Sequence, residues 1–302
     1  MSTKKNKIKN NVTKKHRVSV CASCLEFDMN KIVKSKDSLK PSWLTRHDYV
    51  KDFISKQESF SIKKPKKYDT VMNLNLGKQN ANKKILYWAA DSKSLNSISV
   101  KNAKDAYNKF HNNGIANTDS NGNVCVHFLC PQLYKTTPVG SSKPQTYFRH
   151  LHFVYANNDQ SSWLSQIYTK IVVCKIKYNK MKSIINTTNK HHVLINALPC
   201  KYYAKDHIPN SFNLFNKDVA KMSVEDLHKW FKEVIKFNYP LIDQHIKTGK
   251  MQIYEVPIIT YCAHDKCNAS ELTVKELMKK GFVNIHEYSG GMKEYRKNKK
   301  YM

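Results

Sequence analysis

The sequence predicts a multi-domain α+β protein in which a β-sandwich is followed by an α/β domain with a parallel sheet. Three observations support this fold class. Short apolar runs bounded by turn signals fill the middle of the chain, as in residues 124–130 after Asp119–Gly122. Toward the C-terminus, apolar runs alternate with amphipathic stretches, which is typical of a parallel sheet with crossover helices. The length of 302 residues is sufficient for two domains.

The composition is strongly basic, with 52 Lys and Arg against 23 Asp and Glu and a formal net charge of +29. This charge favours nucleic acid, acidic proteins or small anionic substrates as partners. No stretch approaches the ~20 apolar residues of a membrane span, and no secretory leader is recognisable. Eight cysteines are too few for a disulfide scaffold, so we expect an intracellular, cytoplasmic protein. Heavy use of Lys, Asn, Ile and Tyr suits an AT-rich genome, such as that of a large DNA virus or of an AT-rich microbe. If the source is a virus, the location would be the host cytoplasm or the virion.

Residues 1–66 are interpreted as a basic, mostly disordered tail and linker. Residues 1–17 are rich in Lys and Asn and contain almost no apolar side chains, so they cannot bury enough surface to fold. A short helix is expected around residues 42–56, and Lys63–Lys67 is a linker. The tail is either a solvated segment or an arm that binds nucleic acid or an acidic protein.

Residues 67–182 are predicted to form the β-sandwich, with strands at 85–90, 124–130 and 171–176 and a helix over 100–112. His150 and His152 are two residues apart, so on a strand both imidazoles face the same side. Such a pair is half of a transition-metal site, and a phenolate from Tyr134 would make it suitable for ferric iron. The alternative is a pair of histidines on the polar face of an exposed strand.

This segment resembles the β-sandwich of intradiol ring-cleavage dioxygenases. The matching pieces, in the order of the family, are Tyr87–Asp91, Thr118–Val124, Cys130–Tyr134, His150–Phe153 and Ser165–Tyr168. The resemblance implies non-haem Fe(III) held by two tyrosines and two histidines, of which Tyr134, His150 and His152 match three. The expected fourth tyrosine is absent after Asp91. Tyr107 could replace it only if its helix folds over the site. A sandwich kept as a binding or structural module is the alternative.

Residues 188–302 are predicted to form the α/β domain. Its expected elements are a buried strand at 193–198, a helix at 224–237 capped by Ser223 and Asp226, a strand at 253–261, a helix at 271–280 ended by Gly281, a strand at 283–288 and a last short helix after a turn at 289–292. Cys262 directly follows the strand at 253–261. The carboxyl ends of parallel strands are where such sheets bind ligands.

The Cys262 segment has the features of a reactive thiol. A helix begins a few residues later, and its N-terminus together with the loop amides is expected to favour the thiolate. Cys267 lies in the same loop and could resolve a persulfide or sulfenate as an intraloop disulfide, or accept the sulfur. The alternative is that both cysteines are buried apolar residues.

Residues 190–300 resemble the rhodanese family. The matching pieces are Val193–Ala197, Tyr203–Ser211, Thr260–Cys262, Ala269–Ser270, Gly281–Asn284 and Tyr288–Met292. The resemblance implies a sulfurtransferase in which Cys262 takes sulfane sulfur from an anionic donor such as thiosulfate and passes it from a persulfide to a thiol acceptor, without a cofactor. Cys267 lies near the place where many members have Arg or Lys. Lys266 and His264 are candidate substitutes. Asn268 stands where related phosphatases need Arg, which argues against phosphatase activity.

The sequence therefore predicts an enzyme, a rhodanese-like sulfurtransferase acting through Cys262. Two alternatives stay open. One is a non-haem iron intradiol-type dioxygenase with an accessory rhodanese domain. The other is a non-catalytic basic binding protein.

Overall fold

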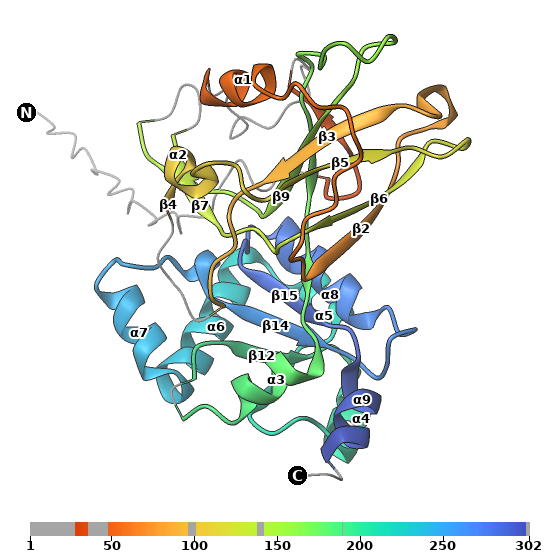
Figure 1. Cartoon of the computed structure of the whole chain (residues 1–302). Helices are drawn as coiled ribbons and strands as arrows, with labels where there is room; N and C mark the ends of the chain where they lie inside the picture. The colour runs from red at the N-terminus through yellow and green to blue at the C-terminus, as the bar shows by residue number, and fades with distance from the viewer. Residues whose placement is uncertain (1–27, 36–47, 96–100, 138–141, 189, 300–302) are drawn as a thin grey trace, which may run out of the picture.

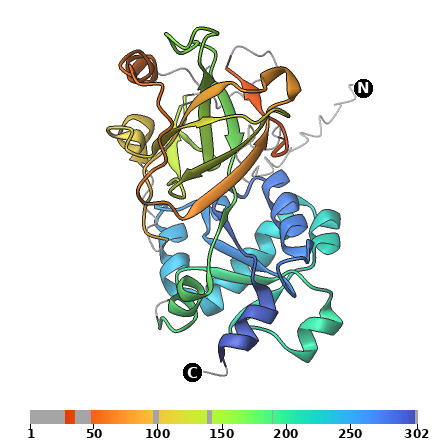
Figure 2. The same ribbon diagram turned by 45° about the vertical axis from the view of Figure 1, so that its right-hand side comes forward.

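The computed structural model describes residues 28–35, 48–95, 101–137, 142–188 and 190–299. These residues form two stacked regions, which Figure 1 and Figure 2 show one above the other. We call the described residues of 28–171 the β-rich region and residues 174–299 the α/β region. The predicted tail at residues 1–17 lies outside the described residues. None of the helices in the described ranges has the length and apolar content needed to cross a membrane.

The β-rich region is built on a five-stranded antiparallel sheet. Its order is β1 (Val33–Lys34), β10 (Tyr168–Ile171), β9 (His150–Tyr155), β3 (Lys84–Ala89) and β5 (Asn113–Asn117). An antiparallel pair, β2 (Thr70–Asn75) and β6 (Asn123–Phe128), covers one face. In β6, Val124, Val126 and Phe128 are buried and the residues between them face outward, as expected for a sheet with one solvated face.

The other face of the five-stranded sheet is covered by short elements. They are α1 (Asp48–Ser55), β4 (Lys101–Asn102), α2 (Ala103–Tyr107), β7 (Tyr134–Thr136) and β8 (Gln145–Thr146), with the 3₁₀ turn η2 (Lys78–Asn80) in the loop before β3. Because β3 is packed on both faces, five of its six side chains are buried. The sequence predicts that residues 28–35 and 48–66 belong to a tail and linker. Instead β1 extends the sheet, and Val50, Phe53 and Ile54 bury the apolar face of α1 in the core.

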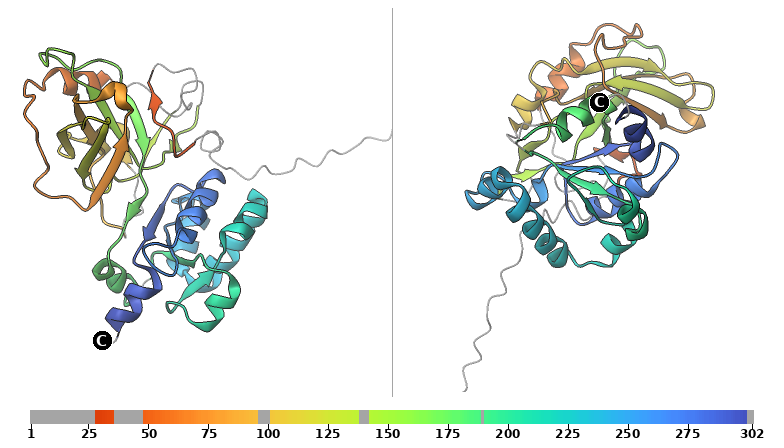
Figure 3. Two further views of the ribbon diagram at one scale, coloured as in Figure 1. Left: turned by 90° about the vertical axis from the view of Figure 1, so that its right-hand side faces the viewer. Right: turned by 90° about the horizontal axis from the view of Figure 1, so that it is seen from below.

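The α/β region contains the predicted parallel sheet. The order of its five strands is β11 (Cys174–Lys175), β15 (Ile285–Tyr288), β14 (Ile258–Tyr261), β12 (Val193–Asn196) and β13 (Ser211–Asn213), all parallel. Figure 3 shows helices on both faces of this sheet. In chain order they are α3 (Tyr178–Ile185), α4 (Cys200–Lys205), α5 (Asn216–Lys221), α6 (Val224–Asn238), α7 (Pro240–Lys247), α8 (Ala269–Lys279) and α9 (Gly291–Lys299), with the 3₁₀ turn η3 (Ile253–Glu255) before β14.

Local signals located several elements correctly. Ser223 caps α6 and forms a capping box with Asp226, and Gly281 follows α8 with φ of +91°. The predicted helix over 100–112 is confined to α2, because the backbone takes positive φ at Asn108 (46°) and Phe110 (54°) before β5 begins.

Two predicted strands differ from the observed ones. The strand expected over 171–176 is divided between the two regions, since Ile171 ends β10 while Cys174 belongs to β11 and pairs with β15. The strand expected over 253–261 begins as η3, and only residues after Pro257 enter the sheet. The first difference places the crossing between the two regions at residues 172–173. A disulfide between Cys130 and Cys174, which the cysteine count did not lead us to expect, ties the regions together there.

Candidate functional site

Cys262 occupies the carboxyl end of the central strand of the parallel sheet. It follows β14, which lies between β12 and β15 and is buried along its whole length. Residues 262–268 then form a short loop, which we call the thiol loop, and α8 begins at Ala269. The apolar strand therefore places the thiol at the edge of the sheet where ligands are usually bound.

The thiol loop is fixed by the start of α9. The backbone N–H of Met292 donates to the carbonyl of Cys262 (2.9 Å), and that of Lys293 donates to the carbonyl of Ala263 (2.9 Å). Gly291 has φ of +58°, and a Cβ at this position would collide with the carbonyl oxygen of Cys262. Only glycine allows both this backbone conformation and this close approach.

The sulfur of Cys262 lies beside two carbonyl oxygens and beside Ser270. The residue is fully buried, and its Sγ is 3.1 Å from the carbonyl oxygen of Cys267 and 3.7 Å from that of His264. These oxygens accept the S–H proton and do not stabilise an anion. Burial is the largest cause that raises the pKa of the Cys262 thiol above its ordinary value, and it outweighs the hydroxyl and backbone N–H of Ser270, which act to lower that pKa. The resting state of Cys262 is therefore the thiol, which differs from the thiolate that we expected from its position before a helix.

The backbone N–H groups of the thiol loop act on Cys267. Burial acts to raise its pKa, but the backbone N–H of Ala269, the thiol of Cys262 and the N–H groups of Ala263 and His264 together lower it below the ordinary value. Its sulfur is partly exposed, whereas that of Cys262 is not. The two thiols thus form a pair in which Cys267 more readily carries the negative charge and Cys262 the proton.

Ser270 contacts Cys262 and Glu287 contacts Ser270, and sequence reasoning did not assign a role to either residue. The Ser270 hydroxyl lies 3.3 Å from the Cys262 sulfur and donates to Glu287 Oε1 (2.6 Å). Glu287 is 5% exposed, and its Oε2 is 3.7 Å from Lys175 Nζ. The available signal was a carboxylate in the apolar run at 283–288, because a buried acid needs partners.

The other two loop residues lie at the surface. His264 and Lys266 are both exposed at the tip of the thiol loop. The structure therefore brings Cys262 and Cys267 together with Ser270 and leaves the two candidate anion-binding side chains at the rim.

The α/β region matches a known family. A family model described as rhodanese-like domain covers residues 178–298. This segment is a rhodanese-like domain. The family model begins at the first helix of the α/β region, α3, and covers none of residues 67–177, so the intradiol resemblance of that segment stays a prediction.

Solved structures similar to this chain include sulfurtransferases. An uncharacterised protein from Saccharomyces cerevisiae shares 18% identity with a TM-score of 0.31, and the match covers 42% of this chain and 92% of that one. A single-domain sulfurtransferase from the same yeast shares 12% identity with a TM-score of 0.31, with 42% and 91% covered. A human single-domain sulfurtransferase shares 11% identity with a TM-score of 0.29, with 42% and 97% covered. No curated protein matches the chain.

Outside the rhodanese-like domain, the predicted metal ligands also come together. Tyr134 on β7 places its Oη 2.8 Å from Nε2 of His150 on β9. The rings of His150 and His152 lie side by side, with centroids 4.7 Å apart, and both histidines are buried. The alternative of two histidines on an exposed strand is therefore wrong. The strand is covered on both faces, by α1 and α2 on one side and by β2 and β6 on the other.

Tyr107 completes this group, which we call the Tyr–His cluster (Tyr107, Tyr134, His150 and His152). Its Oη lies 3.1 Å from Tyr134 Oη and 3.1 Å from His150 Nε2. Helix α2 thus folds over the site, which was the condition for Tyr107 to take the place of the missing tyrosine. The positive φ at Asn108 and Phe110 ends the helix immediately after Tyr107 and returns the chain to β5.

The imidazoles of the Tyr–His cluster are oriented by their outer nitrogens. His150 Nδ1 lies 2.7 Å from the carbonyl oxygen of Phe148 and must donate to it, so Nε2 presents a lone pair to the two phenols. His152 Nδ1 is 2.7 Å from Thr169 Oγ1. Tyr107 and His152 line a cavity of about 660 Å³. Within the described ranges, no three His, Cys, Asp or Glu side chains gather as a metal site, so a metal here would depend on the phenols.

Proposed function

We propose that the rhodanese-like domain is a sulfurtransferase that carries sulfane sulfur as a persulfide on Cys262. The observation that supports this most is the pairing of a thiol at the end of β14 with a second thiol whose pKa is lowered. The donor is a small anion of the thiosulfate type, and the acceptor is a thiol.

The first half-reaction begins with a proton transfer inside the thiol loop. The Cys262 S–H gives its proton to the Cys267 thiolate, which acts as the base. The Cys262 thiolate then attacks the outer sulfur of the donor. The S–S bond of thiosulfate breaks, sulfite leaves with the bonding electrons, and Cys262 carries the persulfide. Ser270 keeps the Cys262 sulfur in place, because its own hydroxyl is held by Glu287.

The second half-reaction has two routes that differ in the role of Cys267. In direct transfer, the acceptor thiolate attacks the outer sulfur of the persulfide and Cys262 leaves as a thiolate. In the resolving route, Cys267 attacks the Cys262 sulfur, hydrosulfide leaves, and an intraloop disulfide forms that two external thiols reduce. His264 and Lys266 at the rim attract the anionic donor, in line with the net charge of +29.

Mass spectrometry of the full chain after incubation with thiosulfate tests the proposal. The wild type is expected to gain about 32 Da, one sulfur atom, on the peptide that contains Cys262. Cys262→Ser should lose this gain, and Cys200→Ser, which removes an exposed free cysteine, should keep it. Equal labelling and equal transfer rates in the wild type and Cys262→Ser would show that Cys262 is not the nucleophile.

A second proposal concerns the β-rich region, in which the Tyr–His cluster would hold a transition-metal ion, with Fe(III) as the best match. Ligands about 2.0–2.1 Å from one ion lie about 2.8–3.4 Å from one another, and the observed separations of 2.8 and 3.1 Å fall in this range. His150 also donates its outer N–H to a carbonyl, as metal-bound histidines usually do. Fe(III) would supply Lewis-acid and redox chemistry at the cavity lined by Tyr107 and His152.

Metal analysis and visible absorption spectroscopy test this second proposal. After addition of iron, the wild type should hold about one ion per chain and show a tyrosinate-to-iron charge-transfer band. Tyr107→Phe and Tyr134→Phe should each weaken or shift the band. Tyr155→Phe, a buried tyrosine in the other core of this region, should leave it unchanged. A colourless wild type without bound iron contradicts the proposal.

A further inference from the structure

Within the described ranges, a buried arginine at the junction of the two regions has no anionic partner. Arg149, which precedes β9, is 9% exposed and donates through Nη2 to Asn284 Oδ1 (2.7 Å). Its Nε and Nη1 groups have no hydrogen-bond partner among the residues that the structure describes. A guanidinium carries five N–H donors and remains charged, so leaving these groups unpaired in a desolvated place is costly. Burial lowers the pKa of Arg149 to about 9, which still leaves it a cation at neutral pH.

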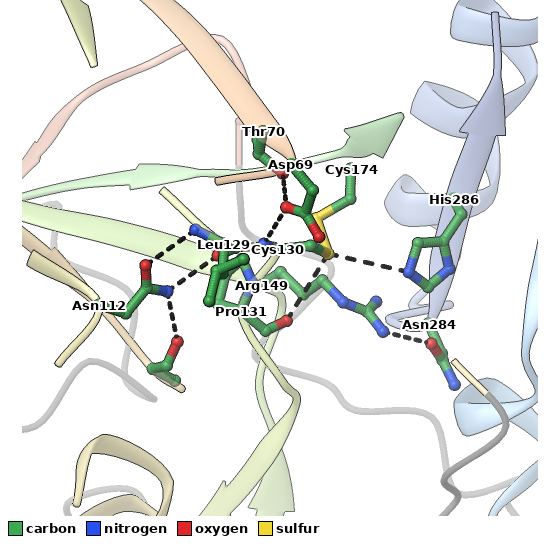
Figure 4. Close-up of a disulfide and its surroundings, with 11 residues drawn as sticks. Asp69, Thr70, Asn112, Leu129, Cys130, Pro131, Arg149, Cys174, Asn284 and His286 are labelled. Atoms are coloured by element: carbon green, nitrogen blue, oxygen red, sulfur yellow. Dashed lines mark hydrogen bonds between the residues drawn. A yellow bond between two sulfur atoms is a disulfide. The ribbon is translucent and has the colours of Figure 1, made fainter. Parts of the chain in front are cut away.

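Arg149 borders a cavity of about 470 Å³ between the β-rich region and the rhodanese-like domain, which we call the junction cavity. Figure 4 shows its guanidinium beside the Cys130–Cys174 disulfide and close to His286 and Asn284. Two other buried groups of the lining have unpaired atoms, Gln132 Oε1 and His286 Nδ1. Several orphaned polar atoms around one cavity indicate a polar occupant, because buried polar groups in folded proteins are nearly always paired.

The charges around the junction cavity favour an anion. Lys175, Lys177 and Lys180 line it together with the N-terminus of α3, which has no acidic residue in its first turn and no side-chain cap. A helix N-terminus with free amides adds positive potential. The positive charge of Arg149 and of Lys180 also reaches His286, where burial and these neighbours lower the pKa well below its ordinary value.

The two carboxylates of the lining are already engaged. Asp69 accepts from the backbone N–H of Cys130 (2.6 Å) and from the Thr70 hydroxyl (2.9 Å). Glu255 accepts from the backbone N–H of Gln252 (2.7 Å) and pairs with Lys135 Nζ (3.4 Å). Neither carboxylate is a hydrogen-bond partner of Arg149, so its charge remains available to a ligand.

We propose that the junction cavity binds an oxyanion of the phosphate, sulfate or thiosulfate type through Arg149. The cavity is larger than one such ion and lies in the size range of small-molecule sites. The site is distinct from the thiol loop, because Asn284 precedes β15 at the amino end of the sheet whereas Cys262 follows β14 at the carboxyl end. An occupant would bridge the two regions next to their disulfide.

Isothermal titration of the full chain with inorganic phosphate, sulfate and thiosulfate, against chloride at matched ionic strength, tests the proposal. The wild type should bind at least one of the three oxyanions saturably. Arg149→Met should weaken that binding about 10-fold or more, as expected for loss of charge-assisted hydrogen bonds. The matched control Arg296→Met removes an exposed arginine paired with Asp206 and should bind like the wild type. Phenyl phosphate distinguishes a free oxyanion from an oxyanion group on a small organic molecule. If phenyl phosphate binds more tightly than phosphate, the ligand is a small organic molecule, and if the two bind equally, it is the free ion.

Thermal unfolding in chloride separates binding from folding. Arg149→Met removes an unpaired buried charge, so it should be at least as stable as the wild type, and oxyanions should no longer raise its melting temperature. If this variant does not fold, Lys180→Met at the exposed rim must still weaken oxyanion binding severalfold. Unchanged affinity in whichever of these variants folds, or the absence of saturable binding of all three oxyanions to the wild type, overturns the proposal.

Discussion

The thiol loop and the Tyr–His cluster are assembled in opposite ways. The thiol loop is one continuous segment, and its electrostatics come from backbone groups, namely the carbonyls that face Cys262 and the N–H groups that face Cys267. The Tyr–His cluster joins side chains from α2, β7 and β9, and its geometry comes from the packing of a sheet that is buried on both faces. A small change in the backbone should therefore disturb the thiol loop strongly. The Tyr–His cluster should respond mainly to changes in side-chain packing.

Independence of the two sites gives the largest expected effect. Cys262→Ser should lower sulfur transfer from thiosulfate at least about 1000-fold, as for loss of a nucleophile, and should leave bound iron unchanged. His150→Gln should remove the iron and its visible band, with sulfur transfer within about 2-fold of the wild type because the Tyr–His cluster lies in the β-rich region and the thiol loop in the α/β region. Parallel loss of both activities in either variant would show that the two sites are coupled, and the comparison would fail.

Gly291→Ala tests the dependence of the thiol loop on its backbone. The new Cβ would strain a positive φ and collide with the Cys262 carbonyl, so we expect a loss of about 2–4 kcal/mol of stability. Sulfur transfer should fall about 10–100-fold, since small displacements of a nucleophile are costly. Iron binding should not change.

The matched control is Gly249→Ala. This glycine also has a positive φ, +71°, but a Cβ there meets nothing within 4 Å. It should lose only about 1–2 kcal/mol from backbone strain, and sulfur transfer should stay the same. Equal transfer rates in the two variants, measured by the thiosulfate and cyanide assay, would mean that the α9 contact does not position Cys262.

The contrast between the sites also explains what the sequence could predict. The apolar strand before Cys262 and the spacing of His150 and His152 are patterns along the chain. The first predicts that Cys262 follows a strand, and the second predicts that the two imidazoles lie side by side. The direction of the backbone groups in the thiol loop is not encoded in any residue type, so the thiolate was assigned to Cys262 instead of Cys267. Tyr107 was uncertain because helical periodicity does not show where α2 turns back.

Partners that depend on tertiary structure were missed for a related reason. Ser270 and Glu287 meet only because β15 lies parallel to β14 and α8 packs across both. Arg149 directly precedes β9, and the alternation of side chains along the strand places it on the opposite side from its neighbour His150. Sequence alone gives this alternation but not the second region that covers the side chain.

Glu287→Gln is expected to have a moderate effect on the thiol loop. The amide keeps the shape of the carboxylate but weakens its hydrogen bond from Ser270, so the Cys262 sulfur loses its fixed support. Sulfur transfer should fall about 3–30-fold, mostly in kcat, for the loss of one charge-assisted hydrogen bond. Ser270→Ala should have a similar effect.

The double variant Ser270→Ala with Glu287→Gln should be no worse than either single one, because the two side chains act through the same contact. Glu276→Gln is the control, because Glu276 pairs with Lys279 on the surface of α8. If the losses of sulfur-transfer rate add up in the double variant, these residues serve only packing. The same conclusion would follow if the pH–rate profile is unchanged in both single variants and in the double variant.

The smallest expected effect is a shift in the pH at which the cysteines react. The lowered pKa of Cys267 means that its thiolate forms at lower pH, so its alkylation by iodoacetamide should reach half the maximal rate at a pH below the ordinary thiol pKa of about 8.5. The raised pKa of Cys262 should move its midpoint above that ordinary value. Peptide mass spectrometry from pH 6 to about 10, spanning the ordinary thiol value near 8.5, measures each midpoint. The access of iodoacetamide to a thiol changes the maximal rate of alkylation but not the pH of the midpoint. If the alkylation midpoint of Cys262 lies at a lower pH than that of Cys267, the backbone N–H groups stabilise the thiolate of Cys262 instead. The roles of base and nucleophile in the thiol loop would then be exchanged.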